Sequence, residues 1–238
     1  MSSPSIEEIS FRNLGFSYEG QGPVLEDCNF DFPMGQVVLV EGGSGTGRST
    51  LLKLLAGLAQ PKAGQYCINQ SIVSEMSFEE FLPLRHQIGY SFDFGGLFAN
   101  RTLWENMTLP LLYQNALPAE EIEERVSFLT KKFGFWDARG RRPAEVSGGM
   151  RKACVVARAF VMHPQMLLMD DPFVALTEDM VDLVMDLVGA FRKQGRLKHV
   201  FLTTRDDRAL RRTEHCRIFI ENKKLLMREQ VGGKVVNL

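Results

Sequence analysis

The sequence predicts an α/β fold with a mainly parallel central sheet. Short apolar runs alternate with amphipathic helical patterns, which is typical of parallel strands joined by helices. A glycine-rich loop follows one apolar run directly, and a second apolar run ends in acidic residues. The 238 residues are 45% hydrophobic and 24% charged, as expected for a globular domain. We expect a single domain over residues 1–238 with an inserted subdomain.

The first forty residues are predicted to be rich in β-structure. Apolar side chains recur near every second position in 6–18, which suggests two β segments, and again in 24–32. A Pro-Met-Gly turn at 33–35 precedes the run Val-Val-Leu-Val at 37–40. A β-branched run of this kind is typical of a parallel strand buried on both faces.

The remainder of the chain alternates between helix and strand. A helix is expected to begin near Arg48 and to end at Gly57 as its C-cap. Further strands are predicted over 65–69, 88–92, 166–169, 200–202 and 218–221, and helical structure over 102–159 and 181–191.

Composition excludes several classes of protein. The net charge of −1 gives no bulk attraction to nucleic acid, so we expect no nucleic-acid partner. The four cysteines are far apart and form no C-x-x-C pair, so metal binding and disulfides are not expected. The first residues lack a signal-peptide pattern, and no apolar stretch approaches the ~20 residues that span a bilayer. We expect a cytoplasmic protein or one held at a membrane by a partner.

The glycine-rich loop predicts a nucleotide-binding site. It has the pattern G-x-x-x-x-G-K-[ST], except that Arg48 replaces the lysine. Backbone N–H groups of such a loop surround phosphate oxygens, and the following helix adds a favourable dipole. Ser49 is expected to ligate Mg²⁺. The predicted nucleotide-binding residues of this loop are Gly42, Gly43, Ser44, Gly45, Thr46, Gly47, Arg48, Ser49 and Thr50.

Arg48 changes the expected energetics of the loop. Lysine places one compact ammonium against the β- and γ-phosphates, whereas arginine is planar, bulkier and forked. The positive charge is kept, so nucleotide binding can survive. Placement of the γ-phosphate is expected to suffer, and positioning contributes most of phosphoryl-transfer catalysis.

A second glycine motif precedes the acidic strand. Ser147, Gly148, Gly149 and Met150 open a predicted helix and form another anion site of backbone amides. This motif resembles the L-S-G-G-Q signature of ABC-transporter ATPases. The resemblance covers about residues 6–226. It implies a P-loop NTPase fold of the ABC type, with an N-terminal antiparallel β subdomain, an inserted helical subdomain over about 93–160 and a C-terminal tail over about 227–238.

The resemblance also implies roles for individual residues. Tyr18 falls where the family stacks an aromatic ring on adenine, and 92–98 falls at its glutamine loop. Asp170 ends a segment that resembles the Walker B strand and would bind Mg²⁺ through water. The signature would face the γ-phosphate held by the other subunit of a head-to-tail dimer. ATP and Mg²⁺ are therefore the implied cofactors.

Several segments are most similar, within this family, to Mla/Mkl (Mce-associated) lipid-transport ATPases. They are S-G-G-M-R at 147–151, D-x-P-F at 170–173 and the stretch from 96 to 111. This resemblance implies lipid or phospholipid transport at the inner membrane. It also implies an integral-membrane permease that contacts residues 93–112, with this chain peripheral on the cytoplasmic face.

The chain departs from the family pattern where the chemistry occurs. Arg48 replaces Lys, Asp93 aligns with the glutamine, and Asp171 replaces the catalytic Glu. Because Asp is one methylene shorter, its oxygens should lie about 1 Å or more from the productive position, which can cost ~100-fold in rate.

Two further departures flank the last helix of the sequence pattern. Thr177 aligns with an Asp, and Thr204 aligns with the switch histidine, with Arg205 next to it. Neither Thr204 nor Arg205 can act as a neutral imidazole donor. The chain's histidines lie elsewhere and are expected at the surface or in the core, namely His86, His163, His199 and His215.

These departures predict a subunit that binds ATP and dimerises with weak or absent hydrolysis at its own site. Asp171, Asp93 and Thr204 occupy the catalytic positions, and Ser49 and Asp170 the metal positions. The second ATPase subunit could be identical or different. Two alternatives remain open: a fully active homodimeric transport ATPase with variant residues, and a non-transport, ATP-gated scaffold or regulator.

Overall fold

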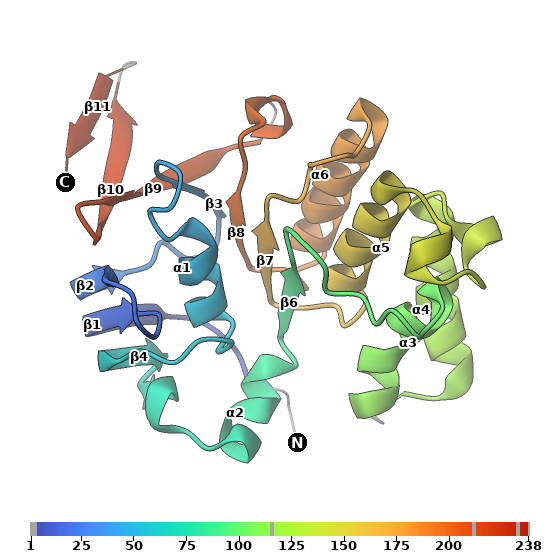
Figure 1. The fold of residues 1–238 in the computed structure, drawn as a ribbon, viewed down its shortest axis with the longest axis horizontal. Coiled ribbons are helices and arrows are strands. Elements are labelled where there is room, and N and C mark those ends of the chain that lie inside the picture. The colour runs from blue at the N-terminus through green and yellow to red at the C-terminus, as the bar shows by residue number, and fades with distance from the viewer. Residues whose placement is uncertain (1–3, 115–116, 211–212, 232–233, 238) are drawn as a thin grey trace.

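The computed structural model describes residues 4–114, 117–210, 213–231 and 234–237, which form two sheets flanked by helices (Figure 1). The smaller sheet is antiparallel, with the order β2-β1-β4-β5. It consists of β1 (Ile9–Ser17), β2 (Pro23–Asp31), β4 (Ala63–Ile68) and β5 (Ser71–Ile72). The two segments predicted in 6–18 are one strand, β1, whose pairing with β2 is interrupted by register shifts.

The larger sheet has the order β11-β10-β9-β3-β8-β7-β6. Its five core strands are parallel, which confirms the predicted mainly parallel sheet. They are β3 (Val37–Glu41), β6 (Ile88–Ser91), β7 (Met166–Asp170), β8 (His199–Thr203) and β9 (His215–Glu221). An antiparallel pair, β10 (Lys224–Val231) and β11 (Lys234–Asn237), extends it. Most of the segment predicted only as a tail at 227–238 is therefore β-structure.

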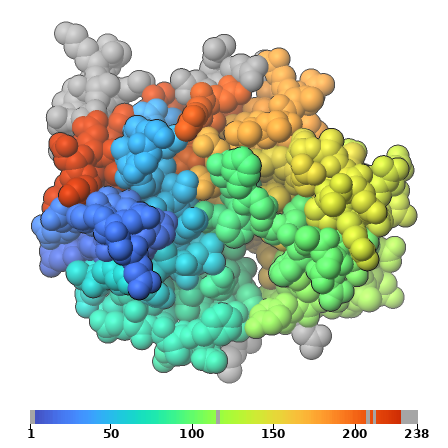
Figure 2. All heavy atoms as spheres, viewed as in Figure 1, coloured from blue at the N-terminus to red at the C-terminus, as the bar shows by residue number. Residues whose placement is uncertain are grey.

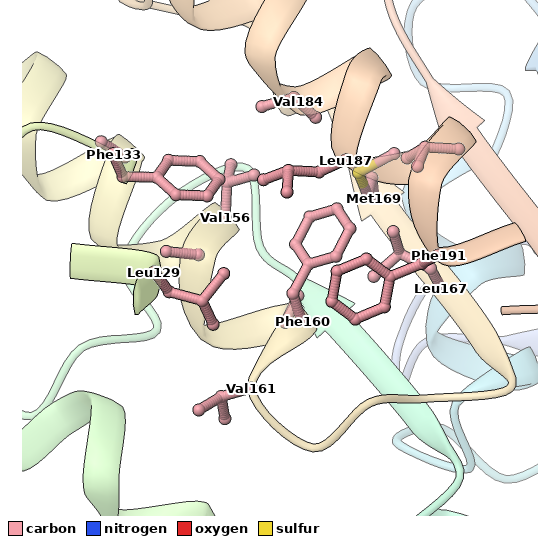
Figure 3. Close-up of a cluster of buried hydrophobic side chains, with 14 of the residues drawn as sticks. Leu129, Phe133, Val156, Phe160, Val161, Leu167, Met169, Val184, Leu187 and Phe191 are labelled. Atoms are coloured by element: carbon pink, nitrogen blue, oxygen red, sulfur yellow. The ribbon is translucent and has the colours of Figure 1, made fainter. Parts of the chain in front are cut away.

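The central strands supply two separate hydrophobic cores. Val38 and Val40 of β3 pack with α1 (Arg48–Leu55) and the antiparallel sheet, whereas Val37 and Leu39 face the opposite core. This alternation follows from the two-residue period of a strand. Figure 3 shows the second core, where Phe160 and Phe191 lie near Leu167 and Met169. These aromatic rings come from α5 (Gly148–Phe160) and α6 (Glu178–Lys193).

The region between β6 and β7 is helical, as expected. It contains α3 (Leu103–Gln114) and α4 (Ala119–Lys132) and ends in α5. Asn106 of α3 is fully buried and fixes the preceding loop: its Oδ1 accepts from Phe98 N (2.7 Å), and its Nδ2 donates to Phe98 O (3.1 Å). The loop from 92 to 98 is thus anchored at its far end.

One helix was absent from the sequence prediction. Helix α2 (Phe78–Arg85) contains Pro83 and begins at a capping box between Ser77 and Glu80. It lies between the antiparallel sheet and β6 along the chain (Figure 1). Within the described part of the chain, no helix has the length and apolar character needed to cross a membrane.

Two histidines are held in the neutral form by burial and hydrogen bonds. His199 Nδ1 accepts from Gly35 N (2.8 Å), so Nε2 carries the proton and donates to Ile6 O (2.7 Å). His163 Nδ1 lies 3.0 Å from Arg196 Nη1, whose N–H donates to it. Burial lowers the pKa of His199 below its ordinary value and, together with nearby arginines, lowers the pKa of His163 to about 4.

The free energy of unfolding is expected to fall as the pH drops below about 6.5, the ordinary histidine pKa. In this window the unfolded chain binds protons that the folded protein does not, so acidification favours unfolding. The loss continues to about pH 4, where folded His163 titrates. Urea unfolding across this range measures the slope. His199→Gln should flatten it, because an amide can make both hydrogen bonds without titrating; an unchanged slope would contradict the assignment.

Candidate functional site

The carboxyl ends of the parallel strands bring the predicted site residues to one edge of the sheet. The glycine loop follows β3, Asp93 follows β6, Asp170 ends β7 and Thr204 follows β8. The register pairs Asp170 with Thr203 across β7 and β8. Ligand sites of open α/β sheets form at this edge, because loops from neighbouring strands meet there.

The glycine loop has a backbone shape that larger residues cannot take. Gly47, the N-cap of α1, has φ 104°, and a Cβ there would lie 2.3 Å from Val24 Cγ1. A Cβ on Gly42 would lie 2.4 Å from Thr46 Oγ1. Thr46 Oγ1 in turn donates to Gly43 O (2.9 Å), which closes the loop on itself. The loop is thus held by β2 on one side and by an internal hydrogen bond on the other.

Gly47→Ala is expected to lower the free energy of unfolding by about 1–3 kcal/mol and to weaken nucleotide binding. The left-handed backbone strains any L-residue by this amount, and the new methyl must also displace Val24. Gly43→Ala is the matched control for stability, because its Cβ would lie 3.6 Å from the nearest atom, an ordinary contact. Urea unfolding of both variants measures the difference, and equal stability would refute this account of the loop.

The predicted metal residues lie side by side. Ser49 Oγ donates to Asp170 Oδ1 (3.0 Å), and Thr203 Oγ1 donates to the same oxygen (2.8 Å). Asp170 is 4% exposed. A hydroxyl and a carboxylate are the hard oxygen donors that Mg²⁺ prefers, and Mg²⁺ commonly completes its shell with water and phosphate oxygens. The described residues contain no group of three or more His, Cys, Asp or Glu side chains able to hold a metal. The Ser49 hydroxyl and the Asp170 carboxylate fit Mg²⁺ that is bound together with a nucleotide, by the chemistry of their oxygens.

Asp171 follows directly in a strained conformation. Its φ is 39°, in the left-handed region, and its backbone N donates to Thr203 Oγ1 (2.9 Å). Its side chain is half-buried. Such a conformation costs about 1–3 kcal/mol in a non-glycine residue and is common at functional sites. The negative charge of Asp171 raises the pKa of Asp93 and that of Lys152, so its carboxylate lies near this pair.

Asp93 is paired with a lysine that sequence reasoning missed. Lys152 Nζ lies 3.9 Å from Asp93 Oδ1. Burial raises the pKa of Asp93, the nearby Lys152 lowers it, and the charges of Asp171 and Asp170 raise it further. Burial likewise lowers the pKa of Lys152, against the opposing effect of these carboxylates. The available signal was a lysine on the apolar face of a helix, with Val155 and Val156 three and four residues later.

Tyr18 and Arg48 flank the glycine loop. Tyr18 Oη lies 3.0 Å from Thr50 Oγ1, and its ring packs edge-on against Phe16 while remaining 38% exposed. Arg48 is the first residue of α1, and in the described part of the chain its guanidinium makes no hydrogen bond or ion pair. An aromatic ring and an unengaged cation are therefore both available to a ligand at this loop.

The signature motif caps helix α5. Ser147 Oγ accepts from Met150 N (3.2 Å), and Gly148 and Gly149 begin the thirteen-residue helix. A Cβ on Gly149 would lie 2.8 Å from Ala175 O, so this glycine permits close contact with the loop after β7. A helix N-terminus favours anions in general, and this one lies in a different loop from the chain's own glycine loop.

The remaining predicted residues, Thr204 and Arg205 after β8 and Thr177 after β7, differ in how far their side chains are exposed to solvent. Thr204 is 8% exposed, and its Oγ1 accepts from Asp206 N (2.9 Å). Arg205 is exposed, and its charge lowers the pKa of Asp93. Thr177 lies exposed at the N-cap of α6 without a side-chain cap bond. Arg205 is therefore the side chain more available to a ligand at this edge.

Comparison with protein families finds one family model, described as ABC transporter, that matches residues 25–174. A methionine import ATP-binding protein of Acinetobacter baylyi is 31% identical over 202 residues, 84% of this chain and 56% of that protein. A methionine import ATP-binding protein of Rhodopseudomonas palustris is 35% identical over 179 residues, covering 75% and 48%. This chain spans about half the length of these relatives.

Two solved structures share the fold over nearly their whole length. One is a dimeric bacterial ABC transporter cassette, with a TM-score of 0.82 and 26% identity over 91% of this chain and 96% of the other. The other is a dimeric ATP-binding cassette in a post-hydrolysis state bound to ADP and Pi, with a TM-score of 0.82 and 25% identity over the same shares. The fold prediction is confirmed, whereas the expected similarity to Mla/Mkl lipid ATPases finds no support in these relatives.

Proposed function

This chain belongs to the ABC transporter ATPase family, and we propose on that premise that it is an ATP-binding subunit that closes around nucleotide but hydrolyses it weakly. One observation carries the proposal. The groups that hold a nucleotide and its metal are intact and adjacent, since Ser49 and Asp170 lie 3.0 Å apart behind a glycine loop. The groups that would place the γ-phosphate and water are altered.

Binding is supported by each part of the loop. Backbone N–H groups of residues 43–48 and the α1 N-terminus would bind phosphate oxygens. The ring of Tyr18 offers an apolar face for a base. Ser49 and Asp170 would hold Mg²⁺, which when bound bridges phosphate oxygens and offsets their charge.

Weak hydrolysis is supported by three replacements at the carboxyl edge of the sheet. Arg48 carries its charge on a planar fork that differs in shape from an ammonium. Asp171 has a shorter reach than the Glu that it replaces. Asp93 forms an ion pair with Lys152, 3.9 Å away. The glutamine that it replaces would be a neutral amide, free to hydrogen-bond with water. Each alters positioning, on which phosphoryl transfer depends.

A docking surface for a membrane permease is part of the proposal. A pocket of about 330 Å³ is lined mainly by apolar side chains from α2, β6, α3 and the turn after α1, including Leu58, Phe78 and Tyr113. Figure 2 shows the surface hollowed between the teal α2 segment and the green helical region. Phe94 and Phe98, in the predicted contact segment 93–112, are also exposed. Exposed apolar surface of this kind is typical of interaction sites.

The cargo and the location of the chain are proposed from the names of its relatives and from its motifs. The relatives described above are named for methionine import, which suggests an import substrate, whereas lipid transport is supported only by motif resemblance. We place the chain on the cytoplasmic face of the membrane, beside a permease and a second ATPase subunit. Transport assays with methionine and phospholipid as competing cargoes, in cells with and without the chain, would distinguish the two.

Binding and turnover measured on the same preparation test the proposal. ATP should bind in a Mg²⁺-dependent manner, and steady-state hydrolysis by the purified chain should be low. Turnover comparable to that of ordinary ABC ATPases would favour the active homodimer instead. Absence of nucleotide binding would overturn the proposal.

A further inference from the structure

Lys152 joins three elements at the centre of the site. It is the fifth residue of α5, and its side chain is only 7% exposed. Its Nζ donates to Phe92 O (3.0 Å), Asp93 O (3.1 Å) and Asp170 O (3.4 Å). An ammonium has three N–H donors, so each of them has a backbone acceptor. Two acceptors follow β6 and the third ends β7.

The charge of Lys152 is also compensated. A buried ammonium is costly unless it is paired and hydrogen-bonded. The Asp93 carboxylate, 3.9 Å away and 34% exposed, supplies the opposite charge. Lys152 therefore contacts the loop after β6 at the backbone oxygens of Phe92 and Asp93, and it is also paired with the Asp93 carboxylate.

The same lysine connects this loop to the nucleotide site. Asp170 presents its backbone oxygen to Lys152 and its carboxylate to Ser49 and Thr203. Polar contacts thus run from Ser49 through Asp170 and Lys152 to the loop at 92–98. Three residues before Lys152, Gly149 packs against the loop after β7 at the start of the same helix. No hydrogen bond of Lys152 reaches the glycine loop itself.

We propose that Lys152 is a positioning residue that couples nucleotide and metal at Ser49 and Asp170 to the loop 92–98 and the N-terminus of α5. The coupling rests on the proposed function, because it requires that nucleotide binds. Ligand contact with Ser49 and Asp170 alters the hydrogen bonds of Asp170, and Lys152 transmits this change to the two backbone oxygens that it holds. The side chain of Lys152 acts through Asp170 and does not contact the nucleotide.

Hydrogen–deuterium exchange detected by mass spectrometry tests the coupling without requiring turnover. Mg²⁺ with a non-hydrolysable ATP analogue should slow exchange in wild-type peptides covering 42–50 and 92–98. In Lys152→Met, the peptide at 42–50 should still be protected. In the wild type, nucleotide is expected to slow exchange of the peptide at 92–98 roughly tenfold, a usual size for coupling between sites. In Lys152→Met, exchange of this peptide should no longer be slowed by nucleotide.

Lys152→Gln is the second variant, because its amide keeps two N–H donors and is better tolerated in the polar pocket; it should show a partial response. Lys198→Met, which removes a lysine paired with Glu7 away from the site, should behave as the wild type. If 92–98 exchanges faster in the Lys152 variants but is still slowed by nucleotide to the wild-type degree, the coupling is overturned. Missing protection of 42–50 in the wild type would overturn the proposed function and the coupling with it.

Discussion

Replacing Arg48 by Lys and Asp171 by Glu together is expected to raise ATP turnover by about 100-fold, the usual cost of a 1 Å misplacement in an active site. The lysine restores a compact ammonium at the phosphates, and the glutamate restores the missing methylene. Asp171 is half-buried, so its side chain is not enclosed by the core. Nucleotide affinity should change little, since charge is conserved at both positions.

Steady-state phosphate release and equilibrium ATP binding, measured side by side, check this expectation. Arg12→Lys is a suitable control, because Arg12 forms an exposed ion pair with Asp31 on the antiparallel sheet. Adding Asp93→Gln to the double variant should increase turnover further, since it replaces the carboxylate paired with Lys152 by a neutral amide. Unchanged turnover in all these variants would show that the replaced residues do not limit hydrolysis.

Asp170→Asn should weaken Mg²⁺-dependent ATP binding by about 10- to 100-fold, the usual effect of removing a group that orients a metal's ligands. Asn has nearly the same shape, and its carbonyl oxygen can accept the hydrogen bonds from Ser49 and Thr203. The variant therefore removes the negative charge while preserving the packing. ATP binding without Mg²⁺ should be retained, because the backbone amides of the loop are unchanged.

Titration calorimetry with and without Mg²⁺ separates the two contributions. Asp27→Asn is the matched control: Asp27 has φ 45°, which Asn tolerates, and its carboxylate pairs with Lys224 at the surface. Equal loss of binding in the presence and absence of Mg²⁺ would point to damage to the loop rather than to the metal site, and would contradict the assigned role of Asp170.

Much of the fold was predictable because its signals are local. The run at 37–40, the glycines after it and the helix from Arg48 are contiguous in the chain, and the structure places them as β3, the loop and α1. Helix α2 was missed although Ser77 and Glu80 form a capping box that can be recognised in a sequence. Pro83 inside the helix masks that signal, because proline ordinarily interrupts a helix.

Local pattern was thus sufficient for most of the elements and for the glycine loop. The partnership among Lys152, Asp93 and Asp170 was decided only by tertiary packing. These residues are separated by 59 and 18 positions, and no spacing rule connects a helix side chain to carbonyl oxygens at the ends of two other strands. The surroundings of Arg48 were likewise decided by tertiary packing, although its position in the sequence predicts that it binds phosphate. Its position relative to Asp171 and Asp93 arises only when the carboxyl ends of the parallel strands meet.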